Sequence, residues 1–107
     1  MSDSLDDDCP PVPEFPGSIV REMKIINRRG LHARATAKFV QCVENFDGVE
    51  IKVHRCGETV GGTSIMGILT LGAGIGSTIT VAARGERAQD ALDAIGALVA
   101  NRFGEDE

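Results

Sequence analysis

Tryptophan and tyrosine are absent from this chain, and only four of its 107 residues are phenylalanine. Domains that bind single-stranded nucleic acid usually stack the bases on aromatic side chains, so the composition disfavours nucleic-acid binding. Long apolar runs are also missing, and no stretch approaches the roughly 18 residues of a helical membrane span. The first residues are acidic where a secretory signal peptide would be basic. We therefore expect a cytoplasmic protein with no membrane insertion.

Cysteine is scarce, and its pattern matches neither a disulfide framework nor a zinc site. Cys9, Cys42 and Cys56 are odd in number and form no CxxC pair. We expect three reduced thiols, as is usual in the cytoplasm. His54 and Cys56 have the spacing of half a metal site, but a second pair of ligands is missing. The sequence therefore predicts no metal and no cofactor.

Proline and unbalanced charge are confined to one end of the chain. All four prolines lie in the first 16 residues, together with five acidic residues and no Lys or Arg. From Ser18 onward acids and bases are equal in number. An acidic, proline-rich segment has too little apolar surface to order itself. We predict a disordered tail over residues 1–17 and one folded domain over residues 18–107.

The hydrophobic pattern of the rest alternates between the strand and helix periods. Helical spacing is found over residues 33–44, 65–71 and 88–102, and strand patterns over residues 21–27, 49–54, 58–61 and 78–83. The predicted order is β-α-β-β-α-β-α. It indicates an α+β open-faced sandwich, with a four-stranded sheet and three helices on one face. The other face should meet solvent and carry His54 as a surface residue.

One histidine stands where the first helix is predicted to begin. No acid occurs between Glu22 and Glu44, whereas this stretch holds five basic residues: Lys24, Arg28, Arg29, Arg34 and Lys38. The first N–H groups of a helix lack intrahelical partners and bind phosphate well. His32 is therefore a candidate phosphoryl acceptor, with Arg34 placed to meet the phosphoryl oxygens. The alternative is that His32 is only a helix cap or a surface residue.

Two motifs carry a resemblance to a known family. Gly30-Leu31-His32-Ala33-Arg34 and Thr63-Ser64-Ile65-Met66-Gly67 resemble the active-site and regulatory-serine segments of HPr. HPr is the histidine-containing phosphocarrier of the phosphoenolpyruvate-dependent phosphotransferase system. The resemblance runs over residues 21–103. Residues 45–47 and 97–107 are also somewhat similar to the nitrogen-related branch of that family.

The resemblance implies a carrier that acts as a substrate of phosphotransferases and is not itself an enzyme. It implies an antiparallel sheet and a phosphoryl group carried on Nδ1 of His32 and stabilised by Arg34. Ser64 would be a regulatory phosphorylation site, whose alternative role is that of a helix cap. The partner-docking surface would consist of Ile65, Met66 and Leu69. Ile65 and Met66 could instead be simple core residues of a short helix.

The resemblance also implies partners. The donor would be an Enzyme I-type phosphotransferase, the acceptor an Enzyme IIA-type protein, and an HPr kinase/phosphorylase would act on the serine. The carrier would be a monomer. An alternative function is a regulatory interaction module that signals through its phosphorylation state and passes little phosphate onward to sugar uptake.

Overall fold

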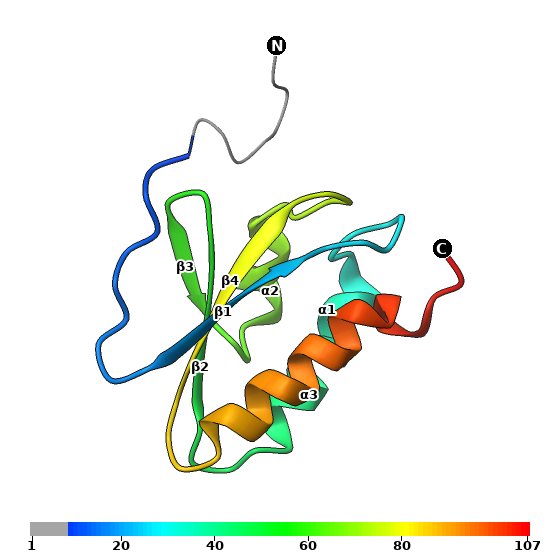
Figure 1. The fold of residues 1–107 in the computed structure, drawn as a ribbon. Coiled ribbons are helices and arrows are strands. Elements are labelled where there is room, and N and C mark those ends of the chain that lie inside the picture. Colours follow the sequence, from blue (N-terminus) through cyan, green and yellow to red (C-terminus); the bar gives the residue numbers. More distant parts are fainter. Residues whose placement is uncertain (1–8) are drawn as a thin grey trace.

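The computed structural model describes residues 9–107, and Figure 1 shows their fold. Its elements are β1 (Ile19–Lys24), α1 (Ala33–Glu44), β2 (Glu50–Arg55), β3 (Glu58–Gly61), α2 (Ile65–Thr70), β4 (Thr78–Arg84), α3 (Ala88–Ala100) and a final 3₁₀ turn (Arg102–Gly104). The predicted order of elements and the α+β class are confirmed. The first strand lies earlier than expected, at residues 19–24 instead of 21–27.

The four strands form one antiparallel sheet in the order β1-β4-β2-β3. The three helices lie on one side of it (Figure 1). The register follows the alternation of the sequence: Val53 is opposite Val81 on the helix-facing side, and His54 is opposite Thr80 on the other side. We call this second side the outer face of the sheet.

The core lies between the sheet and the helices. Phe39, Ile79, Val81 and Ile95 are fully buried there. α1 begins at Ala33 and has no proline or glycine in its interior. Its apolar residues recur on one side, as expected for a helix that covers a sheet. This packing holds the start of α1 at one end of the sheet, where the loops after β1 and α3 also arrive.

The outer face differs from expectation because the N-terminal segment covers part of it. Residues 9–17 run along the sheet, on the side away from α3 (Figure 1). Cys9 and Cys56 form a disulfide, so the prediction of three free thiols is wrong for this pair, and only Cys42 is free among the described cysteines. His54 is 3% exposed, and the Phe15 ring stands edge-on to its imidazole, so the prediction of a surface histidine is also wrong.

The alternation of β2 correctly placed His54 on the outer face, but it could not show that another segment covers this face. Of the tail predicted to be disordered, residues 1–8 lie outside the described residues. For residues 9–17, disorder in solution stays a prediction. None of the helices in residues 9–107 is long and apolar enough to cross a bilayer.

Candidate functional site

The loop between β1 and α1 is held by a buried asparagine and a glycine. The amide of Asn27, which is fully buried, donates to the carbonyl of Gly30 at 2.8 Å. Gly30 has a φ of +69°, and a Cβ there would lie 2.6 Å from the carbonyl oxygen of Ala73. Only glycine fits both this backbone conformation and this close approach. The N–H of Leu31 donates to the same Ala73 oxygen at 2.9 Å, which fixes the chain just before the helix.

His32 is the residue that caps α1. Its backbone is extended, and its Nδ1 accepts a hydrogen bond from the N–H of Arg34 at 3.3 Å. Serine, threonine, aspartate and asparagine usually fill this role, so a histidine cap is unusual. The hydrogen bond points the Nδ1 lone pair into the first turn of the helix, which is where an anion binds best.

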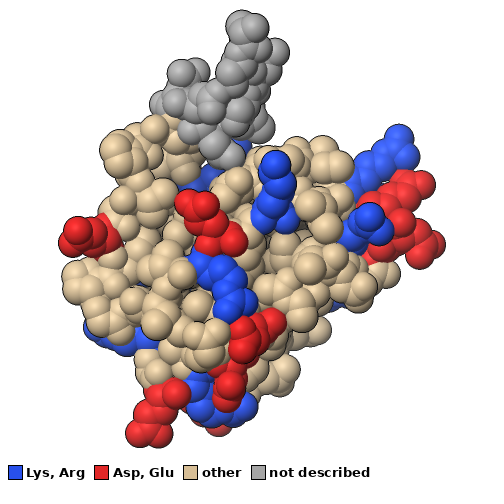
Figure 2. Space-filling model, in the orientation of Figure 1, with Lys and Arg blue, Asp and Glu red and all other residues tan. Residues whose placement is uncertain are grey.

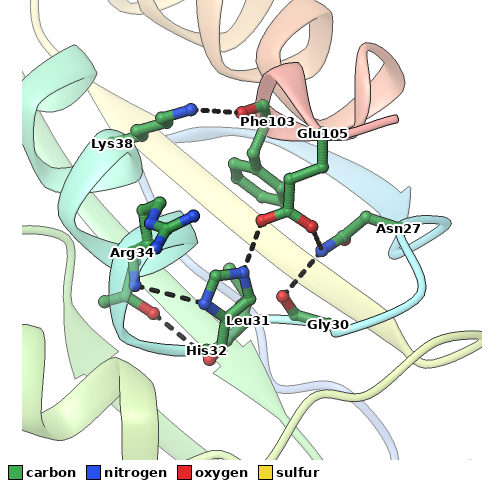
Figure 3. A network of polar contacts seen from close by, with 9 residues as sticks. Asn27, Gly30, Leu31, His32, Arg34, Lys38, Phe103 and Glu105 are labelled. Carbon is green, nitrogen blue, oxygen red and sulfur yellow. Dashed lines mark hydrogen bonds and ion pairs between the residues drawn. The ribbon is translucent and has the colours of Figure 1, made fainter. Parts of the chain in front are cut away.

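The other ring nitrogen of His32 contacts an acidic residue from the far end of the chain. Figure 3 shows the imidazole between the Arg34 N–H and the carboxylate of Glu105. Glu105 is 73 positions away in sequence and pairs with Nε2 through one carboxylate oxygen. Its second oxygen accepts from the Asn27 amide at 3.1 Å. Glu105 and the loop thus hold the ring from two sides.

These contacts define the tautomer of His32. The hydrogen bond with His32 holds the pKa of Glu105 below its ordinary value, and the Asn27 amide adds to this effect against the opposing effect of burial. An ionised carboxylate can only accept a hydrogen bond, so the proton of the contact sits on Nε2. Nδ1 then keeps its lone pair, and a neutral imidazole of this kind is a nucleophile.

The segment that carries Glu105 is fastened to α1 and to the loop. The Phe103 ring is fully buried, and its carbonyl accepts from Lys38 Nζ at 2.6 Å (Figure 3). At the end of the segment, the Glu107 carboxylate and the Arg28 guanidinium form an ion pair at 2.8 Å, and the Arg28 N–H donates to the Glu107 carbonyl. These contacts hold the segment in the position in which Glu105 reaches His32.

The basic residues predicted to surround His32 therefore lie close to acidic residues of the C-terminal segment in the folded protein. A hollow beside His32 is lined by Arg28, Arg29, Arg34, Lys38 and residues 104–107. Figure 2 shows basic and acidic side chains close together at this end of the molecule. Sequence reasoning missed Asn27 and Glu105. No acid lies near His32 along the chain, but Glu105 contacts it in the folded protein.

Ser64 caps α2, as expected. Its hydroxyl oxygen accepts from the N–H of Gly67 at 3.0 Å. Ile65 and Met66 are 42% and 72% exposed, so neither is a core residue. Leu69 is half-buried, and Ile68 is the residue of α2 that enters the core.

The second histidine takes no part in this site. Nδ1 of His54 contacts the Thr59 hydroxyl at 2.8 Å on the outer face of the sheet. Within residues 9–107 no cluster of three or more His, Cys, Asp or Glu side chains is placed to hold a metal ion.

Comparison with known proteins agrees with the fold. Residues 19–101 match a family model described as "PTS HPr component phosphorylation site". The chain is 52% identical over 87 residues to phosphocarrier protein HPr of Cupriavidus necator, a match that covers 81% of this chain and 97% of that protein. It is 41% identical over 85 residues to phosphocarrier protein NPr of Shewanella violacea, covering 79% of this chain and 92% of the relative.

Solved structures give the same result. The crystal structure of HPr-C-His from Thermoanaerobacter tengcongensis superposes with a TM-score of 0.79 at 35% identity, and the match covers 83% of this chain and 99% of the other. Fold and sequence thus define a small phosphocarrier. The chain belongs to the HPr family of the phosphotransferase system.

Proposed function

We propose that Nδ1 of His32 accepts a phosphoryl group from a phosphorylated Enzyme I-type protein and passes it to an Enzyme IIA-type acceptor. The observation that carries this proposal is the ring itself: Nε2 faces an ionised carboxylate, and Nδ1 faces the first turn of α1. The donor's phosphoenolpyruvate-derived phosphoryl group is the only group that moves.

In the forward step the Nδ1 lone pair forms a bond to phosphorus, and the bond between phosphorus and the donor breaks, with its electron pair leaving on the donor. The Arg34 N–H, which now donates to Nδ1, becomes free to donate to a phosphoryl oxygen. The imidazole gains positive charge as the new bond forms, and the Glu105 carboxylate on Nε2 stabilises this charge. Positioning and charge stabilisation are the main requirements of phosphoryl transfer.

The side chain of Arg34 supplies the second stabilising element of the proposal. It lines the hollow beside His32 together with Lys38. A guanidinium can offer two parallel hydrogen bonds to phosphate oxygens, which an ammonium cannot. Arg34 is therefore the main side-chain ligand of the transferred group, and Lys38 is held back by its bond to the Phe103 carbonyl.

A two-stage transfer assay tests the function. The full chain is incubated with labelled phosphoenolpyruvate and a purified Enzyme I-type protein, and an Enzyme IIA-type protein of the sugar or the nitrogen branch is then added. We expect one acid-labile label on His32, which moves to one of the acceptors. Label that forms but moves to neither acceptor would favour the regulatory module instead. No label at His32 would refute the proposal.

We further propose that phosphorylation of Ser64 weakens partner docking at Ile65, Met66 and Leu69. Ser64 directly precedes Ile65 and Met66, which are exposed, and a phosphate there would add about −1.5 to −2 charge. Because the Gly67 N–H already donates to Ser64, the helix can accept the charge without unfolding. The effect should therefore appear in binding and leave the fold intact.

Ser64→Asp tests this second proposal, with Thr70→Asp as a control that adds the same charge at the other end of α2. We expect Ser64→Asp to raise the apparent KM for the carrier in transfer from Enzyme I about 3- to 10-fold, which corresponds to about 0.7–1.4 kcal/mol. Thr70→Asp should have a smaller effect, and an ATP-dependent HPr kinase should label Ser64 in the wild type. An unchanged KM together with no kinase label would leave Ser64 as a helix cap only.

A further inference from the structure

The Cys9–Cys56 disulfide joins two parts of the molecule that lie on the outer face of the sheet. The two cysteines are 47 positions apart. Cys9 belongs to the N-terminal segment, and Cys56 occupies the turn between β2 and β3. The disulfide therefore ties residues 10–17 down at their far end, while β1 holds them at the near end.

Cys56 occupies a backbone position that disfavours it. Its φ is +48°, in the left-handed region, and Gly57 follows at +87°. Glycine, asparagine and aspartate are the usual residues of such hairpin turns. A cysteine here is difficult to explain by the turn alone. The residue is also exposed at the surface of the turn.

Most residues of the segment are exposed. Pro10, Pro11, Val12 and Pro13 are exposed, so they bury little apolar surface. Phe15 is the half-buried exception and lies edge-on to the His54 ring, with a centroid distance of 6.2 Å. A segment with so little buried surface should separate from the sheet readily once the covalent link is cut.

A defined part of the outer face lies beneath the segment. Cys9, Val12, His54, Thr80 and other residues line a cavity of about 290 Å³ between the segment and the strands. His54, Thr80 and Ala82 are nearly fully buried, although all three lie on the side of the sheet that carries no helix. Removing the segment would uncover His54 and Thr80, which line this cavity.

We propose that Cys9 and Cys56 form a reversible thiol–disulfide switch, which holds residues 10–17 over the outer face of the sheet when oxidised and releases them when reduced. In reduction, a thiolate of a dithiol reductant attacks the sulfur of Cys56, and Cys9 leaves as the thiolate. The second thiol of the reductant then displaces Cys56, the reductant becomes a disulfide, and both cysteines take up a proton. Oxidation by glutathione disulfide reverses the change and yields two glutathione thiols.

The switch acts on a surface that is separate from the His32 site. His32 and Glu105 lie where the loop after β1 meets the end of α3, whereas the segment lies on the sheet side away from α3 (Figure 1). In the cytoplasm, thiol systems keep exposed pairs of this kind reduced. The segment is therefore free at rest and becomes fixed when the surrounding thiol pool is oxidised, and it does not alter the histidine in either state.

Limited proteolysis of the full chain tests the switch. The chain is equilibrated with glutathione disulfide or with dithiothreitol and alkylated, and is then digested with a glutamate-specific endoproteinase. Cleavage after Glu14 is followed by mass spectrometry after full reduction. We expect this cleavage to be at least about tenfold slower in the oxidised chain, because the tied segment must open before a protease can bind it. Cys9→Ser should be cleaved at the fast rate under both conditions, and the matched control Cys42→Ser should respond like the wild type.

A second readout uses the two histidines. On reduction, the imidazole proton resonances of His54 should shift, and those of His32 should not. Equal cleavage rates in the two redox states would overturn the proposal, as would a peptide map of the oxidised chain without the Cys9–Cys56 link. A shift of the His32 resonances would overturn the claim that the two surfaces are independent.

Discussion

The two histidines of this chain have opposite surroundings. His32 begins a helix, its side chain is 24% exposed, and both ring nitrogens have polar partners, one of them an acid. His54 lies within a strand and is 3% exposed. Its Nδ1 contacts Thr59, and its Nε2 is buried with no hydrogen-bond partner among the described residues. His32 is thus accessible and oriented by polar partners, whereas His54 is buried.

The comparison shows that the reactivity of a histidine depends on where its lone pair points. At His32 a carboxylate fixes the proton on Nε2 and leaves Nδ1 directed at backbone N–H groups, which can hold a phosphoryl group. At His54 burial lowers the pKa of the imidazole, and the covering segment blocks a bulky donor. We therefore expect one histidine to carry phosphate and the other to affect stability alone.

The largest expected effect comes from exchanging alanine for each histidine in turn. His32→Ala should reduce labelling from phosphoenolpyruvate and Enzyme I by at least about 1,000-fold, because the nucleophile itself is lost. His54→Ala should label within about twofold of the wild type, because a folded carrier retains its transfer chemistry. The rate of acid-labile label formation measures both. A His32→Ala chain labelled at His54 would break the comparison.

The next effect separates the arginines around His32. Arg34→Ala should slow transfer about 10- to 100-fold, since hydrogen bonds between charged groups are worth about 1.5–3 kcal/mol. Arg28→Ala and Arg29→Ala are the matched controls, and we expect a smaller loss from each. Arg28 in particular already pairs with Glu107. Rapid-quench transfer assays measure all three variants, and equal small effects would reduce Arg34 to one part of a general basic field.

The local part of this site could be predicted from the sequence. The start of α1 at Ala33 and the cap at Ser64 follow from residues that are neighbours along the chain. Hydrophobic periodicity and the residues typical of turns extend over only a few positions, so they can be identified from the sequence. The family resemblance then placed His32 and Arg34 at the functional end of the domain.

The long-range part could not be predicted in this way. Glu105 reaches His32 only because the chain turns sharply after α3, where Arg102 and Phe103 both have a positive φ. The sequence pattern predicts one helix over residues 88–102, whereas α3 ends at Ala100. The pattern therefore does not predict this turn. The Cys9–Cys56 link is equally invisible, since an odd number of cysteines without a motif gives no pairing. Both contacts join residues that are far apart in sequence and meet only when the chain folds.

A smaller effect tests the acid that orients His32. Glu105→Gln should slow transfer about 3- to 10-fold, because an amide loses the charge that stabilises the phosphorylated ring but retains a hydrogen-bond acceptor. Glu107→Gln removes a charge from the same segment without touching the histidine and should have almost no effect. A ¹⁵N spectrum should also show a larger Nδ1–H tautomer fraction of His32 in Glu105→Gln alone. Identical rates for the two variants would remove Glu105 from the mechanism.

The smallest expected effect is a difference in the pH dependence of folding stability. Burial lowers the pKa of His54 below its ordinary value of 6.5, so the unfolded chain binds a proton there more readily than the folded one. Stability should therefore fall as the pH drops from above 6.5 towards the folded pKa.

Glu105 acts in a separate pH window. Its pKa is lowered from 4.5, mainly by the hydrogen bond with His32, so its contribution to stability is full above 4.5 and is lost as the pH falls through the folded pKa. Denaturant titrations between pH 8 and pH 3 should show two steps of decline. His54→Gln should remove the upper step, and Glu105→Gln should reduce the lower one. If His54→Gln leaves the upper step in place, burial of His54 is not its cause, and the contrast between the two histidines then rests on transfer chemistry alone.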